Sequence, residues 1–155
     1  MNKKVIAGLA AITLSVAFFQ TAHSQIEIKE KPKAVTLGKV KSGSALIAEL
    51  TYTVEDKDTL FTIFYNNAEY KTLTDIQAIV FDGQDNTFGK FYDVLKSFFS
   101  DENKKNKEYA VSLKLGGKNV NLMNMRVMGT TSVMVHGEKG YFYLTEKQVD
   151  KLFGK

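Results

Sequence analysis

Few residues of this chain combine the types and the spacing that catalysis requires. The chain contains two histidines, and only His136 lies outside the first 24 residues. A histidine that binds a metal or moves a proton needs partners at suitable spacing, and no such partner stands beside His136 in the sequence. We therefore interpret His136 as a residue near the end of a β-hairpin and assign it no catalytic role.

Carboxylates cluster at Glu55–Asp58 and again at Asp82–Asn86. The second cluster, with the sequence Asp-Gly-Gln-Asp-Asn, is faintly similar to a calcium-binding loop because oxygen ligands alternate around a glycine. It lacks the spacing to a closing bidentate glutamate, so a turn from a strand into a capped helix explains the same residues. We predict no metal site and no cofactor.

Other catalytic signatures are missing from the sequence. The chain has no cysteine, no serine in a Gly-x-Ser-x-Gly context and no glycine-rich phosphate loop. A pair of carboxylates that meet only in space leaves no sequence signal, so a hydrolase of that kind remains an alternative. We expect no enzyme and name no catalytic residue.

The aromatic residues give the remaining functional signal. Core packing is their first interpretation because aromatic side chains bury large areas, and a pocket or a partner-binding face is the alternative. Four methionines between Met123 and Met134 fit either a core or an adaptable binding surface. The candidate binding residues are Phe98, Phe99, His136, Tyr141 and Tyr143.

The first 24 residues have the parts of a secretory signal peptide. Two lysines precede an apolar run from Val5 to Phe19, and Ala22 and Ser24 occupy the −3 and −1 positions of a cleavage site before Gln25. The run is about 15 residues long, whereas a membrane-spanning helix needs roughly 20. We expect export to the periplasm or the exterior, with no membrane span after signal removal and a single domain at 25–155.

The charge of the chain does not indicate a nucleic-acid partner. The formal net charge of +4 falls to +2 when Lys3 and Lys4 leave with the signal peptide, which is ordinary for a soluble domain. The one dense basic stretch, 104–107, reads Lys-Lys-Asn-Lys and has acidic neighbours on both sides. This pattern is typical of a solvated loop, and contact with a polyanion is the alternative.

Alternating hydrophobicity predicts three β-hairpins, each with a register that sorts apolar side chains onto one face. The expected turns are Asp56-Lys57, Gly116-Gly117 and Gly137–Gly140, and the expected apolar pairs include Leu50 with Ile63, Leu113 with Val120, and Val135 with Phe142. The Gly-Gly turn is able to take the positive φ angles that two-residue hairpins favour. Further strands are expected at Ile76–Phe81 and Ala34–Val40.

Two helices interrupt the strands. The first carries an aromatic stripe at helical spacing, and Asn86 or Thr87 is expected to cap its start; the stripe consists of Phe88, Phe91, Tyr92, Leu95, Phe98 and Phe99. In the second helix Thr145 and Gln148 form a capping box, and Gly154 ends it. The chain therefore predicts an α+β domain with a mainly antiparallel sheet of about 7–9 strands in hairpins. A half-open barrel is one shape that such a sheet adopts.

Together these features predict a non-enzymatic exported protein of the bacterial envelope that binds a ligand or interacts with another protein. The sequence does not identify the partner, and an envelope protein and a small apolar ligand are the two candidates. Alternatively, the protein carries a small apolar ligand in an aromatic-lined cleft between sheet and helix. A hydrolase that uses a pair of carboxylates is the second alternative.

Overall fold

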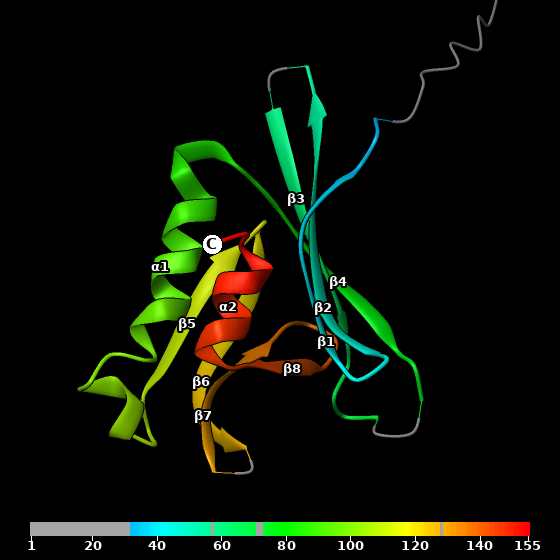
Figure 1. The fold of residues 1–155 in the computed structure, drawn as a ribbon. Helices are drawn as coiled ribbons and strands as arrows, with labels where there is room; N and C mark the ends of the chain where they lie inside the picture. Colours follow the sequence, from blue (N-terminus) through cyan, green and yellow to red (C-terminus); the bar gives the residue numbers. More distant parts are fainter. Residues whose placement is uncertain (1–31, 57, 71–72, 128) are drawn as a thin grey trace, which may run out of the picture. The chain divides into compact units, whose positions relative to one another are not determined.

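The computed structural model describes residues 32–155 except 57, 71–72 and 128 (Figure 1). The predicted signal peptide at 1–24 and its cleavage site before Gln25 lie outside the described residues. No helix among the residues that the structure describes is long and apolar enough to cross a membrane.

Among the residues that the structure describes, eight strands form two separate antiparallel sheets, each with its strands in sequence order. The first sheet consists of β1 (Val35–Ser42), β2 (Ala45–Glu55), β3 (Asp58–Asn66) and β4 (Ile76–Asp82). The second sheet consists of β5 (Ala110–Leu115), β6 (Lys118–Val127), β7 (Thr130–His136) and β8 (Tyr141–Leu144). The α+β class is confirmed. The half-open barrel does not form, because a helix and a long loop separate β4 from β5 and the two strands do not pair.

The three predicted hairpins have the predicted registers. Each of the expected pairs occurs, including Leu50 with Ile63, Leu113 with Val120, and Val135 with Phe142. Both glycines of the turn between β5 and β6 have positive φ, 58° at Gly116 and 78° at Gly117. The local pattern of apolar residues and turn residues was therefore sufficient to set strand pairing.

The hairpin of β6 and β7 extends beyond both neighbouring strands. The pairing of β5 with β6 ends at Met123, and the pairing of β8 with β7 begins at Val133. Met125–Val127 pair with Thr130–Ser132 and, in the described part of the chain, with no other strand. We call these two segments the hairpin tip. Because successive side chains of a strand point to opposite faces, the tip presents two faces of different chemistry.

The helices are α1 (Thr87–Ser97) and α2 (Glu146–Leu152), and short 3₁₀ helices lie at Gln84–Asn86 and Asn103–Lys105. The capping box of α2 is confirmed, with the Thr145 backbone N–H donating to Gln148 Oε1 at 2.8 Å. The expected side-chain cap of α1 is wrong. Asn86 occupies the cap position, but its backbone is left-handed and its side chain forms no capping bond.

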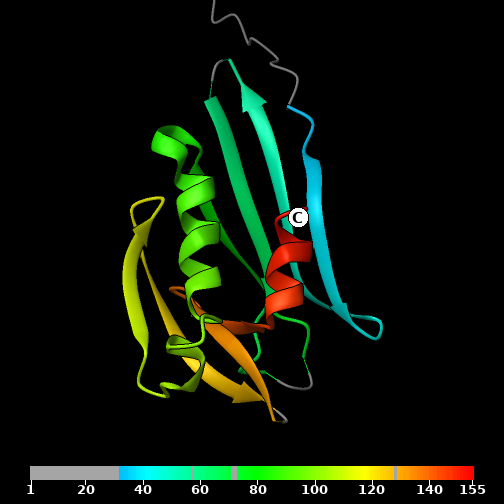
Figure 2. The same cartoon turned by 60° about the vertical axis from the view of Figure 1, so that its left-hand side comes forward.

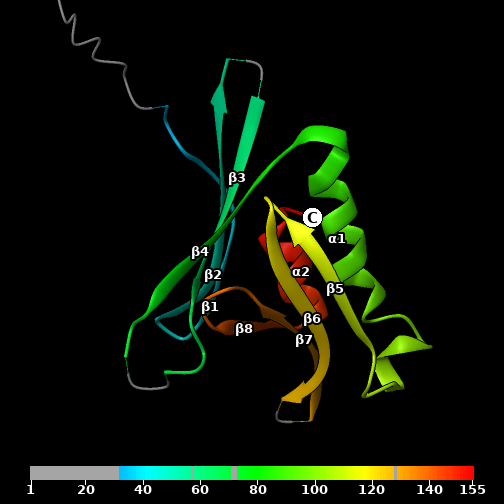
Figure 3. The same cartoon turned by 180° about the vertical axis from the view of Figure 1, so that it is seen from behind.

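Both helices lie on one face of the first sheet (Figures 1 and 3), where apolar side chains of sheets and helices form a common core. Phe91 of α1 is buried, and its ring lies 6.0 Å from that of Phe81 on β4 and 6.0 Å from that of Phe153 after α2. Helix α2 packs on β1 at Gly38, where an added Cβ would lie 2.2 Å from the Lys151 carbonyl oxygen. Helix α2, which follows the second sheet in the chain, thus packs on the first sheet (Figure 2).

Candidate functional site

Three of the predicted binding residues lie together on the second sheet. His136 and Tyr141 are paired across β7 and β8, and Tyr143 lies two residues further along the same face. The rings of His136 and Tyr141 stack with centroids 6.2 Å apart, and those of Tyr141 and Tyr143 meet edge to face at 5.3 Å. This face points away from the core, because the alternate residues Phe142 and Leu144 are buried. Burial and then the neighbouring Tyr141 raise the pKa of the Tyr143 hydroxyl above its usual value.

The other two predicted residues lie elsewhere. Phe98 is fully buried, and its ring packs 4.7 Å from the ring of Tyr109. Phe99 is partly buried against the same core. Phe98 therefore has a structural role in this fold and offers no surface to a ligand. The predicted set of five residues divides into three on the outer face and two on the core side.

Tyr143 also lines a groove with a volume of about 430 Å³ between the two sheets. One wall comes from the start of β2 and the end of β3, and the other comes from the hairpin tip, β8 and the start of α2. The apolar lining residues are Ala45, Leu46, Ile47, Ala68, Val127, Phe142 and Tyr143, and the polar ones are Asn66, Thr130, Ser132, Thr145 and Gln148.

None of the described residues that line the groove carries a charge. Two of its amide side chains are held in place by backbone groups: the Asp75 N–H donates to Asn66 Oδ1 at 3.0 Å, and the Thr145 N–H donates to Gln148 Oε1. The oxygen of each amide is engaged, so the NH2 group of each remains as a donor for a ligand. Apolar walls with a few fixed polar groups are the usual lining of a small-molecule site.

The carboxylates lie outside this groove and serve other contacts. Asp75 accepts hydrogen bonds from the side chains of Asn67 at 3.0 Å and Gln77 at 2.6 Å. Glu55 and Asp58 face each other beside the turn between β2 and β3, where both are exposed. Within the described ranges, no three histidine, aspartate or glutamate side chains lie close enough to hold a metal ion.

Most residues that line the groove could not be predicted from the sequence. Tyr143 was identified through its aromatic neighbours, but Leu46, Ile47 and Asn66 belong to strands that are distant in sequence and show no unusual composition. Only the packing of the first sheet against β8 brings these residues opposite the hairpin tip. No signal in a single sequence reports such a contact between strand ends.

Comparison of the chain with protein-family models, with curated proteins and with solved structures finds no match.

Proposed function

We propose that this chain is an exported, non-enzymatic binding protein that holds a small, uncharged and mainly apolar ligand in the groove between its sheets. The groove itself carries the proposal. Its volume of about 430 Å³ is within the range of small-molecule sites, and its lining combines apolar walls with fixed amide donors and no charge. Export rests on the signal-peptide pattern of the first 24 residues.

The ligand would place its apolar body between the two walls. Leu46 and Ile47 form the wall from the first sheet, and Val127 forms part of the wall from the hairpin tip. Burial of apolar surface contributes about 25 cal/mol per Å² and supplies the affinity. The amide groups of Asn66 and Gln148 would orient a carbonyl or hydroxyl group of the ligand. An ion would be excluded, because no lining residue compensates the loss of its hydration.

An envelope protein as the partner is the second candidate, and the exposed methionines of the second sheet favour it. Met123 and Met125 are 39% and 37% exposed on the face that carries Tyr141 and Tyr143. Flexible thioethers beside aromatic rings form an adaptable contact surface. On this reading, the groove would be the edge of a larger interface.

Binding of Nile red, an uncharged apolar dye, tests the groove directly. Leu46→Glu places a carboxylate in the groove and should weaken dye binding to the chain 25–155 at least tenfold. Leu60→Glu is the matched control, because Leu60 is exposed on the outer face of the first sheet, and it should leave binding unchanged. Thermal melts of both variants verify that each one is folded.

Three outcomes would contradict the proposal. The first is no dye binding by the parent chain together with no retained molecule in native mass spectra of the protein from its host. The second is equal loss of binding in both variants. In the third, the host protein is always recovered with a protein partner and Met123→Glu abolishes that complex, which would favour the second candidate.

A further inference from the structure

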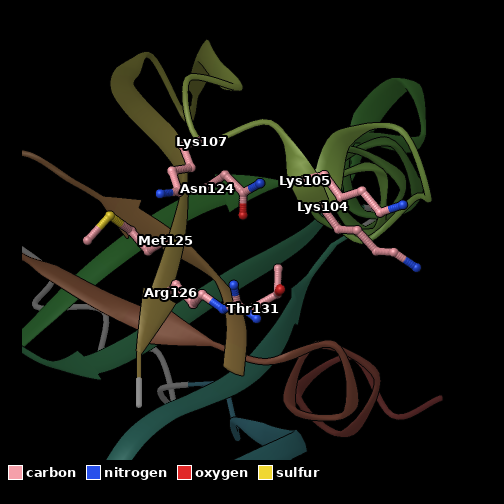
Figure 4. A pocket seen from close by; sticks show the side chains of 7 residues that line it. All are labelled: Lys104, Lys105, Lys107, Asn124, Met125, Arg126 and Thr131. Carbon is pink, nitrogen blue, oxygen red and sulfur yellow. The ribbon is translucent and has the colours of Figure 1, made fainter. Parts of the chain in front are cut away.

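The opposite face of the hairpin tip borders a second cavity, and this one is basic. It has a volume of about 620 Å³ and lies between the tip and the loop that follows α1 (Figure 4). Asn124, Met125, Arg126 and Thr131 line it from β6 and β7. The polar three, Asn124, Arg126 and Thr131, lie on the face opposite to Val127 and Ser132, whereas Met125 shares the face of those two residues. One hairpin therefore separates an uncharged groove from a basic pocket.

Four cationic side chains and, among the described residues, no carboxylate line this pocket; the cations belong to Lys104, Lys105, Lys107 and Arg126. One of the four, Lys104, forms an ion pair with Asp101, whose side chain is almost fully exposed. Lys104 and Lys105 lie together on one side of the pocket, and Lys107 lies apart from them (Figure 4). Concentrated positive charge in a concave site attracts an anion and favours its entry.

Arg126 is the only arginine among the 21 basic residues of the chain. Its Nε donates to the carbonyl oxygen of Gly129 at 3.1 Å, which fixes the orientation of the planar guanidinium group. The two terminal nitrogens then form the fork that binds two oxygens of one phosphate or carboxylate group. Arg126 faces Thr131 across the two strands, and the hydroxyl of Thr131 is a further donor to an anion.

Asn124 holds the lysine-bearing loop beside the arginine. Its carboxamide is largely buried and donates to the carbonyl oxygens of Asn103 at 2.7 Å and Asn106 at 2.9 Å. These two carbonyls flank Lys104 and Lys105 in sequence. The backbone of the loop is thus fixed against the hairpin tip, and ligand binding would order only the lysine side chains. Such preorganisation lowers the entropic cost of binding.

We propose that this pocket binds a multiply charged phosphate anion. Four cations exceed what a single monovalent group needs, and the cavity has room for more than one phosphate group. Arginine and lysine in combination are the residues that phosphate groups prefer, the first as a fork and the second as mobile point charges. The pocket is independent of the uncharged groove, because different side chains of the tip line the two sites.

Titration calorimetry of chain 25–155 with inorganic tripolyphosphate tests this proposal. At low ionic strength we expect one binding site, and the affinity should fall as salt is added. Arg126→Gln should weaken binding at least tenfold. Arg126→Lys should bind more tightly than Arg126→Gln but more weakly than the parent, because a lysine keeps the charge but cannot form the fork. Lys114→Gln removes the same charge from the exposed outer face of β5 and should change the affinity less than twofold.

Two further binding experiments distinguish the chemical class of the anion and its source. Citrate, which has comparable charge but carboxylate groups, should bind at least tenfold more weakly than tripolyphosphate, and equal binding would overturn the phosphate assignment. Vesicles that contain phosphatidic acid test whether the phosphate belongs to a lipid headgroup. The proposal is wrong if neither tripolyphosphate nor these vesicles bind, or if Arg126→Gln and Lys114→Gln weaken binding equally.

Discussion

The two halves of the molecule have the same order of elements, four antiparallel strands followed by a helix, yet they contribute differently to its cavities. The first sheet directs one face into the core and exposes Leu60, Phe64 and Val80 on the other face. The second half and the loop that leads into it supply every described residue of the basic pocket, and the second half supplies more than half of those that line the uncharged groove. The first half therefore provides support, and the second half provides most of both sites.

Unequal strand lengths account for this difference. In the first sheet each strand is accompanied by its neighbour over most of its length, from Ala48 to Glu55 in β2, for example. In the second sheet, β6 has 10 residues and β8 only 4, so the hairpin tip has no strand beside it. A strand pair without lateral neighbours has open edges, and alternation of side chains gives each of its two faces its own chemistry. The alternation of side chains that places apolar residues in the core thus also gives the two cavities beside the tip different linings.

The largest predicted effect concerns the contact that joins the two halves. Phe91→Ala removes a buried ring that lies between Phe81 and Phe153, and it should lower the free energy of unfolding by about 3–5 kcal/mol. Phe64→Ala, on the exposed face of the first sheet, should cost under about 1 kcal/mol. Urea unfolding measures both. If the two variants had equal stability, α1 would not join the halves as described.

The next largest predicted effect is a difference in stability between substitutions at two adjacent glycines of one turn. Asparagine is common in two-residue hairpin turns, but at Gly116 any added Cβ would clash with the carbonyl oxygen of Val80 on the first sheet. Gly117 has open space around it. Gly116→Ala should cost about 3 kcal/mol, from positive φ plus overpacking, and Gly117→Ala about 1 kcal/mol from φ alone. Equal urea midpoints would mean that the turn does not abut the first sheet.

These glycines also show how far sequence-based prediction extends. The Gly-Gly turn and the register of β5 with β6 follow from residues that are neighbours in the chain. The contact of Gly116 with Val80 depends on how two separate sheets pack, and the sequence contains no periodic signal for it. The sites divide in the same way: the cluster of His136, Tyr141 and Tyr143 arises within one hairpin and was predicted. The groove and the pocket need distant segments. The basic stretch at 104–107 was interpreted as a solvated loop because acidic residues flank it, and its lysines are indeed exposed. Arg126, which lines the same pocket, is 19 residues or more away in the sequence.

A smaller effect tests whether the hairpin tip is held rigid. Asn124→Ala removes two hydrogen bonds to the loop and should lower the free energy of unfolding by about 1–2 kcal/mol. It should also weaken tripolyphosphate binding, because the lysines would no longer be held near Arg126, while Nile red binding in the groove should remain. Asn121→Ala is the control, since Asn121 is exposed and accepts a hydrogen bond from the exposed Ser112. A loss of dye binding with anion binding intact would reverse the assignment of the two faces.

The smallest effect concerns the polar contact between the two helices. Lys96 of α1 donates to Glu146 and Asp150 of α2 at 2.8 and 3.2 Å, and the Tyr92 hydroxyl donates to Asp150 at 2.9 Å. Partial burial alone would raise the pKa of Asp150, but the hydrogen bonds from Lys96 and Tyr92 outweigh it and hold that pKa below its usual value.

A carboxylate whose pKa is lower in the folded state stabilises the fold at neutral pH, and this contribution is lost as the pH falls through the folded pKa. Since the Asp150 side chain is one-third exposed, Asp150→Asn should cost only about 0.5 kcal/mol at pH 7. The difference between variant and parent should shrink as the pH is lowered from 7 toward 3, because the parent carboxylate becomes neutral as well. Urea midpoints at a series of pH values measure this difference. A constant difference at all pH values would mean that Asp150 contributes through packing alone, and that the two halves are joined by their apolar contacts without help from charge.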